Sequence, residues 1–329
     1  MTIAISGTTG VTLAGQFDSA STFGFKNRFI NGQMQIAQRG TTSTSGAAVP
    51  TTTAVYPSVD RWFAYATGAT VTVAQVAGSG SNRNNLQVTG AASVTAVGVG
   101  QRIESLNSYD LAGSTVTLSV NMSNSLLSTV SWQASYASST DTWSTKTTIA
   151  TGSFSVTGTL TNYTTQIVIP AAATTGIEIL FTVGAQTSGT WVIGNAQLEK
   201  TTATATTFDY RPYGTELALC QRYLPYIEFR ANSPVGAGQA TSTTVAIVPL
   251  LFPVPARVPP TALVSPVAGS FYLTDAAYTA KTLTAISATY FGVNAALLSC
   301  TVASGMVAGN GTVLCSVGTY ALYFTGCEL

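Results

Sequence analysis

The chain has 329 residues, a formal net charge of +1 and 8% charged residues, against about 25% in an average soluble domain. Its basic residues are scattered and its apolar residues occur in short runs, which excludes a nucleic-acid-binding basic patch and a membrane-spanning helix of about 20 apolar residues. The complete lack of histidine removes the most common general base and metal ligand.

The low charge has a consequence for assembly. A monomer with so few surface charges would be poorly soluble, so we expect much of the surface to be covered by copies of the chain or by partner proteins. The start, MTIAISGTTG, lacks the basic and apolar regions of a secretion signal, so export by that route is not expected.

The cysteines do not form a zinc or redox motif. None of Cys220, Cys300, Cys315 and Cys327 belongs to a C-x-x-C pair. We expect buried thiols that pack as small apolar side chains. A disulfide between two of them remains an alternative.

Residues 1–24 are small, polar and rich in glycine, without an amphipathic period. We expect a weakly structured segment that docks on another protein.

From residue 25 to residue 212 the pattern predicts short strands separated by polar turns. In residues 114–123, polar and apolar side chains alternate, and Val116, Leu118, Val120 and Met122 fall on one face. Strands of this length and spacing are typical of a sandwich, barrel or jelly roll. Further strands are expected at residues 69–76, 128–137, 162–170, 176–185 and 189–199. We predict an all-β jelly-roll domain.

The stretch WQASYASSTDTW (132–143) predicts an aromatic hairpin. Sugars stack on exposed aromatic faces while nearby polar groups orient their hydroxyls. We expect Trp143 to be exposed after a polar turn, with Asp141 and Lys146 in the same loop. Together with Tyr136, these residues form the candidate glycan site. The alternative is that Tyr136, like Trp132, faces the core.

Residues 213–226 predict a short connecting helix. Thr215 is a candidate N-cap, Glu216 lies in the first turn, and Pro225 ends the helix. One apolar stripe contains Leu217, Cys220, Tyr223 and Leu224.

Residues 227–329 return to short strands and predict a smaller C-terminal β domain. Within it, the proline-rich residues 241–266 favour edge strands and bends.

No motif for catalysis or cofactor binding stands out, so we expect a protein that is not an enzyme and holds no cofactor. A nucleophile with a histidine base is excluded, and the glycine-rich stretches lack the lysine of a phosphate loop. A weak candidate for a structural calcium is Glu199, with Asp60 or Glu104 as a companion. The alternative is that these are ordinary polar or ion-paired residues.

Several motifs occur in a fixed order along the chain. They are NRFINGQMQIAQRG (27–40), YPSVDRWFAY (56–65), QRIE (101–104), GTWVIGNAQLEK (189–200) and FDYRPYGTELALCQRYL (208–224). In this order they resemble a group of tailed-bacteriophage virion proteins, the tail fibres and receptor-binding proteins. The first motif resembles the opening of carbohydrate-binding jelly-roll modules. FPVPARVPPTALV (252–264) resembles the start of the group's C-terminal β domain.

The resemblance implies a structural phage virion protein, homotrimeric and assembled in the host cytoplasm. Residues 1–24 would attach it to other phage tail or capsid proteins. It would be a tail fibre or spike that contacts host surface glycans. The fibre would be short, because the sequence has no coiled coil or repeated shaft. A head fibre or capsid decoration protein without a specific ligand is the alternative. A glycan depolymerase is a third hypothesis, which the lack of β-helix repeats disfavours.

On this interpretation, the stretch around the helix is the joint between the two β domains. Its side chains would pin the last jelly-roll strand, and the apolar stripe could meet its copies at a three-fold axis. The expected joint residues are Tyr210, Arg211, Tyr213, Leu217, Cys220, Tyr223 and Leu224.

Overall fold

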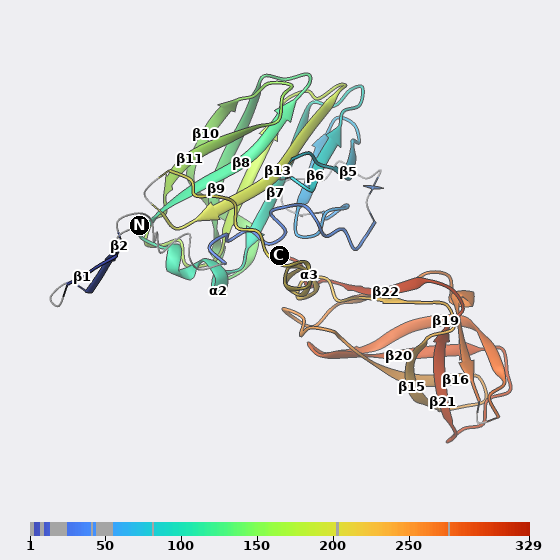
Figure 1. Cartoon of the computed structure of the whole chain (residues 1–329). Helices are drawn as coiled ribbons and strands as arrows, with labels where there is room; N and C mark the ends of the chain where they lie inside the picture. Colours follow the sequence, from blue (N-terminus) through green and yellow to red (C-terminus); the bar gives the residue numbers. More distant parts are fainter. Residues whose placement is uncertain are drawn as a thin grey trace. The chain divides into compact units, whose positions relative to one another are not determined.

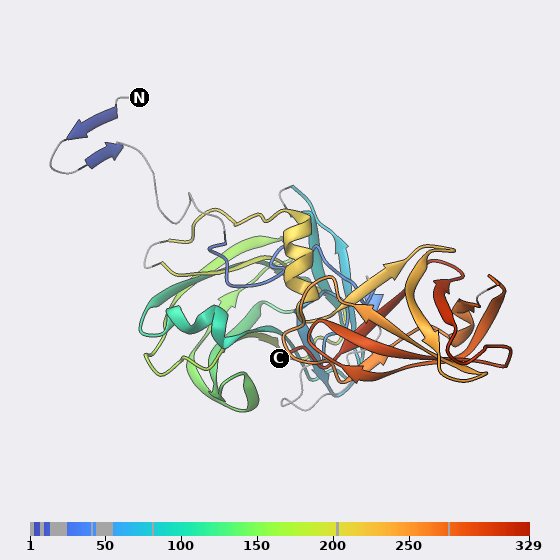
Figure 2. The ribbon, with the colours of Figure 1, turned by 90° about the horizontal axis from the view of Figure 1, so that it is seen from below.

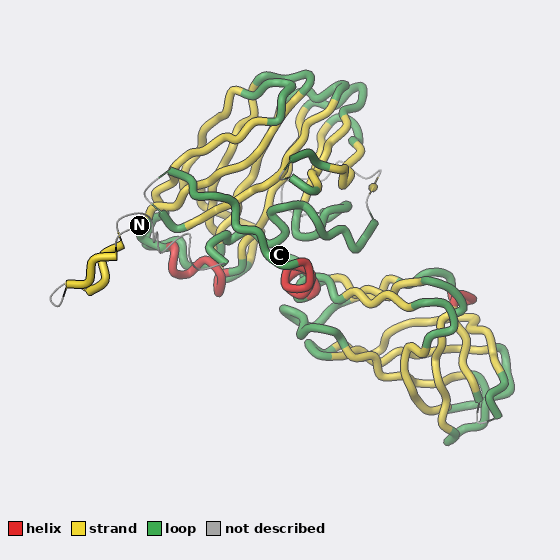
Figure 3. The backbone as a smooth tube through the Cα atoms, in the orientation of Figure 1, coloured by secondary structure: helices red, strands yellow, loops and turns green. Residues whose placement is uncertain are grey.

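The computed structural model describes residues 3–6, 10–13, 25–40, 42–43, 55–80, 82–201, 204–275 and 277–329. Antiparallel strands dominate these residues (Figure 3), so the all-β prediction is confirmed. The chain forms two compact units, Met1–Tyr213 with Leu329 and Gly214–Glu328.

The first described elements form a small hairpin. Strand β1 (Ile3–Ser6) pairs with β2 (Gly10–Leu13) in antiparallel register. The rest of residues 1–24 lies outside the described residues, and the docking role of this segment stays a prediction.

Two antiparallel sheets form a sandwich in the first unit (Figure 1). The five-stranded sheet has the order β10-β9-β12-β7-β4, and the six-stranded sheet has the order β11-β8-β13-β6-β5-β3. The chain changes sheet between β8 and β9 and at each step from β10 to β13, as in a jelly roll.

The five-stranded sheet contains β4 (Phe63–Thr67), β7 (Ala96–Ile103), β9 (Thr129–Ser139), β10 (Thr142–Ser155) and β12 (Ile177–Val183). The six-stranded sheet contains β3 (Thr42–Ser43), β5 (Thr72–Ala77), β6 (Asn84–Thr89), β8 (Thr115–Asn124), β11 (Thr161–Val168) and β13 (Thr190–Glu199).

The core lies between the sheets, where the period of two places the apolar side chains. The predicted face of β8 is fully buried, with Val116, Leu118, Val120 and Met122 all in the core. Burying one such side chain contributes about 1.5–3 kcal/mol. Because a slip of one residue would expose the whole set, this burial fixes the strand register.

Motifs that are far apart in the sequence meet in one polar network of the first unit. The Asn27 side chain donates to Ala196 O at 2.9 Å and accepts from the backbone N–H groups of Phe29 and Leu198, both at 3.0 Å. Arg211 donates to Phe29 O at 3.1 Å and also to Asn27 O. Arg211 is therefore linked to β13 through Asn27.

Two helical turns between β7 and β8 were not predicted. They are α2 (Ser105–Ser108) and η1 (Tyr109–Leu111). None of the described helices is long and apolar enough to cross a membrane.

The helix expected within residues 213–226 is present as α3 (Tyr213–Gln221) (Figure 2), and its role as a connector stays a prediction. It begins at Tyr213, so Thr215 lies inside the helix and the predicted N-cap is wrong. Of the predicted stripe, Cys220, Tyr223 and Leu224 are buried, and Leu217 is half-buried.

Of the expected joint residues, Tyr210 lies before α3 and Tyr213 is its first residue. Tyr210 Oη accepts a hydrogen bond from Asn195 Nδ2 of β13 at 3.4 Å, although its side chain is 49% exposed. Tyr213 is 60% exposed. The three-fold contact stays a prediction.

The second unit contains a closed barrel with the strand order β15-β16-β20-β19-β18-β21 and a three-stranded sheet with the order β14-β22-β17. All four cysteines are buried thiols, as predicted, and none of these described residues forms a disulfide. The elements are β14 (Tyr226–Phe229), β15 (Pro234–Ala240), β16 (Val245–Leu251), β17 (Ala262–Val264), η2 (Ala268–Ser270), β18 (Phe271–Thr274), β19 (Ala280–Phe291), β20 (Ala295–Val302), β21 (Gly311–Ser316) and β22 (Tyr320–Thr325).

Strand β16 is not an edge strand, contrary to the expectation for its proline-rich sequence. It pairs with β20 along its whole length but with β15 only at Ala246 and Ile247. Pro249 lies beyond this second pairing, where a proline is tolerated because the strand has a paired neighbour on one side only.

Candidate functional site

One face of the five-stranded sheet packs on the core; we call the other face the outer face. Ser131 of β9 lies opposite both Ser153 of β10 and Thr182 of β12, and Gln133 lies opposite Thr151 of β10. The residues that alternate with Ser131 and Gln133 along β9 are in the core. Because side chains alternate along a strand, this set projects from the outer face.

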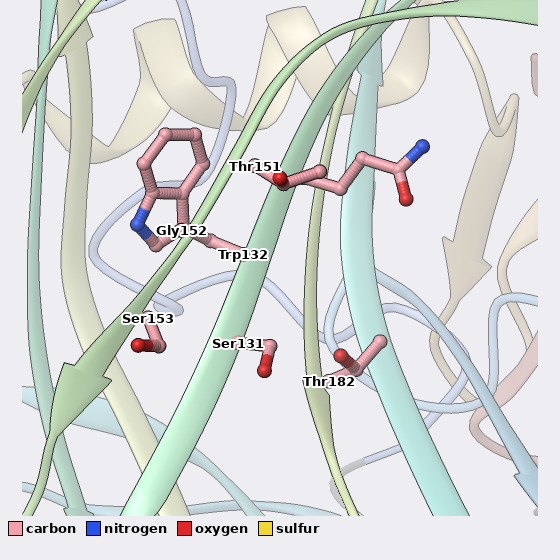
Figure 4. Close-up of a pocket in the computed structure, with 7 residues that line it drawn as sticks. Ser131, Trp132, Thr151, Gly152, Ser153 and Thr182 are labelled. Carbon is pink, nitrogen blue, oxygen red and sulfur yellow. The ribbon is translucent and has the colours of Figure 1, made fainter.

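These side chains line an open depression of about 360 Å³ (Figure 4). The hydroxyl groups of Ser131, Ser153 and Thr182 come from three neighbouring strands (Figure 4). Trp132 and Gly152 complete the lining, and none of the 7 lining residues is charged. The depression therefore offers neutral hydrogen-bond donors and acceptors on a rigid sheet.

The Trp132 ring lies against the backbone of Gly152. A Cβ at position 152 would lie 2.5 Å from the ring, so only glycine allows this approach. Trp132 also packs on Phe154, with ring centroids 6.5 Å apart. An aromatic ring thus supports the lining from the core side.

The Gln133 amide is held in place by its neighbours. Its Nε2 donates to Ser135 Oγ at 3.0 Å and to Thr148 Oγ1 at 2.9 Å. These bonds fix the orientation of the amide on the sheet.

An ionic cluster occupies another part of the outer face. Glu178 of β12 accepts from Arg102 Nε at 2.8 Å and pairs with Lys146. The Glu178 side chain is 2% exposed and that of Lys146 is 26% exposed. The Arg102 guanidinium lies 5.1 Å from the Trp143 ring centroid and 5.3 Å from that of Phe63. The cluster is a buried structural element beside the uncharged depression.

Two aromatic residues of β4 cover glycines of β7. Tyr65 lies opposite Gly98 and Phe63 opposite Gly100. A Cβ at Gly100 would lie 2.6 Å from the Phe63 ring, and one at Gly98 would overlap the Tyr65 ring. Burial, with a smaller contribution from the Glu178 carboxylate, raises the pKa of Tyr65 above 10.0. Its phenol is therefore protonated at neutral pH.

The predicted glycan-site residues do not gather at the depression. Trp143 is 6% exposed, so its predicted exposure is wrong. Lys146 belongs to β10 rather than to a loop. Asp141 accepts from Ser105 N at 2.7 Å and from Ser105 Oγ at 3.1 Å. Tyr136 is partly buried and packs on the core. Their part in glycan binding stays a prediction.

The sequence contained a signal for the residues that do line the depression. The alternation in residues 128–137 puts Val130 and Trp132 on one face of the strand, which leaves Ser131 and Gln133 on the other. The contribution of β10 and β12 depends on strand pairing, which the sequence pattern does not specify.

The calcium expectation for Glu199 is not supported. Its carboxylate accepts from Gln197 Nε2 at 3.1 Å, and from Thr206 N at 2.8 Å and Thr206 Oγ1 at 2.6 Å. Asp60 accepts from Gln38 N at 3.0 Å. Within the described part of the chain, no three Cys, Asp or Glu side chains gather to hold a metal ion.

No protein-family model and no curated protein matches the sequence. Among solved structures, a family 4 carbohydrate-binding module is 15% identical, with a TM-score of 0.36 over 52% of this chain and 98% of that chain. A domain of tailspike protein 4 of bacteriophage CBA120, described as enzymatically active, is 16% identical, with a TM-score of 0.37 over 54% of this chain and 22% of that chain. TmCBM61, solved with β-1,4-galactotriose, is 14% identical, with a TM-score of 0.31 over 43% of this chain and 88% of that chain. Likenesses of this size establish neither a shared family nor a shared function.

Proposed function

We propose that this chain binds host surface glycans through the depression on its outer face. The observation that carries the proposal is the lining by neutral hydroxyl and amide groups from three adjacent strands. Sugar hydroxyls both donate and accept hydrogen bonds, and an uncharged, pre-oriented lining matches them without the cost of removing water from a charge. The nearby cations Arg102 and Lys146 both pair with the carboxylate of Glu178.

The biological setting belongs to the same proposal. The chain is a phage virion protein, a short tail fibre or spike, trimeric and attached through residues 1–24. The ordered sequence motifs described above support this setting, as does the low charge of 8%. Its role is binding rather than catalysis.

A glycan array with the purified full chain tests the binding function. Ser153→Trp places a large side chain in the depression at an exposed position, so binding should be abolished. Ser287→Trp, at an exposed position on barrel strand β19, is the matched control and should bind like the natural chain. If the natural chain bound no glycan of the host surface, the proposal would fail.

Removing one polar group tests the chemistry of the site. Gln133→Ala deletes the oriented amide, and we expect roughly a threefold to tenfold weaker affinity, the loss of one neutral hydrogen bond. Isothermal titration measures it, with an unchanged melting temperature as the control for folding. An unchanged affinity would place the ligand elsewhere.

Immunogold electron microscopy with an antibody against residues 213–329 tests the place on the virion. Gold at the tail supports a fibre or spike. Gold spread over the head would favour the alternative, a head fibre or capsid decoration protein.

A further inference from the structure

The sequence contains two Asn-Gly pairs, Asn31-Gly32 and Asn310-Gly311. An asparagine in this setting can lose its side-chain amide, because glycine has no Cβ to hinder attack by its own backbone nitrogen. That nitrogen attacks Cγ of the asparagine before it. The reaction in a folded chain therefore requires a mobile asparagine side chain and an unbonded N–H group after it. The structure holds the two pairs in opposite surroundings.

The first pair is held in place. Asn31 is fully buried, and its Nδ2 donates to Ile36 O at 2.8 Å and to Asp60 O at 2.9 Å. Its Oδ1 accepts from Ile36 N at 3.0 Å. Gly32 is also enclosed, since a Cβ there would lie 2.2 Å from Ala196 O. The Asn31 side chain can turn toward the next nitrogen only when this part of the chain opens.

The second pair is exposed. It lies where the loop after β20 enters β21 of the barrel. Within the part of the chain that the structure describes, the Asn310 side chain makes no hydrogen bond. Gly309 has a φ of +90°, and a Cβ at Gly309 or at Gly311 would meet no other atom within 4 Å. The Asn310 side chain therefore has open space on both flanks.

The backbone fixes Asn310 but leaves the next N–H group unbonded. Asn310 N donates to Val307 O at 3.1 Å, and Asn310 O accepts from Ala240 N of β15 at 2.9 Å. The C=O and N–H of a trans peptide point in opposite directions, so the Gly311 N–H points away from β15. On that other side, β21 pairs with β18 only from Val313 onward. Among the described strands, none thus bonds the Gly311 nitrogen.

We propose that Asn310 deamidates spontaneously in the folded chain and is a modification site of this protein. Gly311 N forms a bond to Asn310 Cγ and loses its proton, while the Cγ–Nδ2 bond breaks and Nδ2 takes up a proton and leaves as ammonia. Water then opens the resulting succinimide ring at either carbonyl. The product is aspartate or isoaspartate, and water is the only co-reactant.

The modification changes both charge and backbone at this end of the barrel. A carboxylate replaces a neutral amide, which lowers the formal net charge of +1 by one in a chain with only 8% charged residues. In isoaspartate the backbone runs through the former side chain, so the carbonyl that accepts from Ala240 N leaves the main chain. Older copies of the chain therefore differ from new ones where β21 meets β15. This inference does not depend on the proposed function.

Peptide mass spectrometry of the purified full chain, incubated for increasing times, tests the proposal. The peptide that contains Asn310 should gain the mass of an amide-to-carboxylate change, and chromatography should separate its aspartate and isoaspartate forms. Asn310 should react at least about tenfold faster than Asn31, because Asn31 reacts only after local opening. The reaction should also be faster in mildly alkaline than in neutral buffer, since Gly311 N attacks after it loses its proton.

The unfolded chain and one variant supply the controls. In concentrated urea both pairs are accessible, so Asn31 and Asn310 should react at similar rates. Gly311→Ala adds a Cβ that has room in the fold but hinders the attack, so the reaction at Asn310 should slow several-fold with an unchanged melting temperature. A folded chain in which Asn310 stays intact, while both asparagines react in urea, overturns the proposal. So does a folded chain in which Asn31 reacts as fast as Asn310.

Discussion

At the scale of single residues, Glu178 organises one part of the outer face. Its carboxylate holds Arg102 and Lys146, and its charge also acts on Tyr65. A buried carboxylate that pairs with two cations is costly to remove, because the cations then lose this partner. This arrangement contributes to the raised pKa of Tyr65 and places Arg102 over the ring of Trp143.

Glu178→Gln should lower the pKa of Tyr65 while leaving it above 10.0, because burial is the larger cause of the raised value. Absorbance titration of the tyrosinate, with Tyr65→Phe to identify the signal, measures the change. The phenol ionises more readily in the unfolded chain, so the stability that it contributes is present below pH 10 and is lost as the pH rises further. An unchanged or higher pKa in Glu178→Gln would contradict the assignment.

Trp143→Ala should lower the free energy of unfolding by about 3 kcal/mol, the usual cost of deleting a buried tryptophan. Trp143→Phe should cost less, because an aromatic ring stays and Trp143 Nε1 has no hydrogen-bond partner among the described residues. Urea unfolding measures both. Equal stability of Trp143→Ala and the natural chain would restore the exposed position that the sequence predicted.

The sequence could not place Trp143 because its surroundings are not local. The polar turn before it suggested exposure, yet its ring lies beside Arg102 of β7 and near Gly176. By contrast, the burial of Val116, Leu118, Val120 and Met122 follows from a pattern within one strand, and the sequence predicted it.

At the scale of secondary structure, β4 and β7 fit together because β7 lacks side chains at two positions. The rings of Phe63 and Tyr65 occupy the space above Gly100 and Gly98. The outer face at β7 is thus covered by rings of β4, beside the ionic cluster.

Gly98→Ala should destabilise the first unit by about 1–3 kcal/mol, since the added methyl group overlaps the Tyr65 ring. Tyr65→Ala should remove most of this additional cost, so the two changes should not be additive. A double-mutant cycle by urea unfolding measures the coupling. Additive effects would show that the ring and the glycine do not share this space.

For strands, as for single residues, the sequence predicts what a local pattern determines and misses what depends on distant parts of the chain. Regular strands such as β8 and β13 were predicted within one or two residues of their bounds. Strand β10 was taken for a loop at Lys146, because its two register shifts interrupt the alternation. The chain order predicted none of the strand pairs that bring Ser131, Ser153 and Thr182 together.

At the scale of the whole molecule, the unfolding of each unit can be followed through a different type of side chain. All four tryptophans, Trp62, Trp132, Trp143 and Trp191, belong to the first unit, and all four cysteines belong to the second. Burial raises the pKa of Cys300 to about 12, so this thiol reacts with a disulfide reagent only after its barrel opens.

Glu178→Gln should therefore shift the urea transition seen by tryptophan fluorescence to lower concentration, by the equivalent of about 3 kcal/mol. The transition seen by thiol reactivity should stay in place. If both transitions moved together, the two units would unfold as one.

The central claim is that a glycan occupies the depression above Trp132. Fluorine NMR of the chain labelled with fluorotryptophan gives a separate signal for each of the four tryptophans. Titration with a host-surface oligosaccharide should shift the Trp132 signal, leave the Trp62 and Trp191 signals in place, and have no effect in Ser153→Trp. A Trp132 signal that stays unchanged at saturating oligosaccharide would contradict the claim.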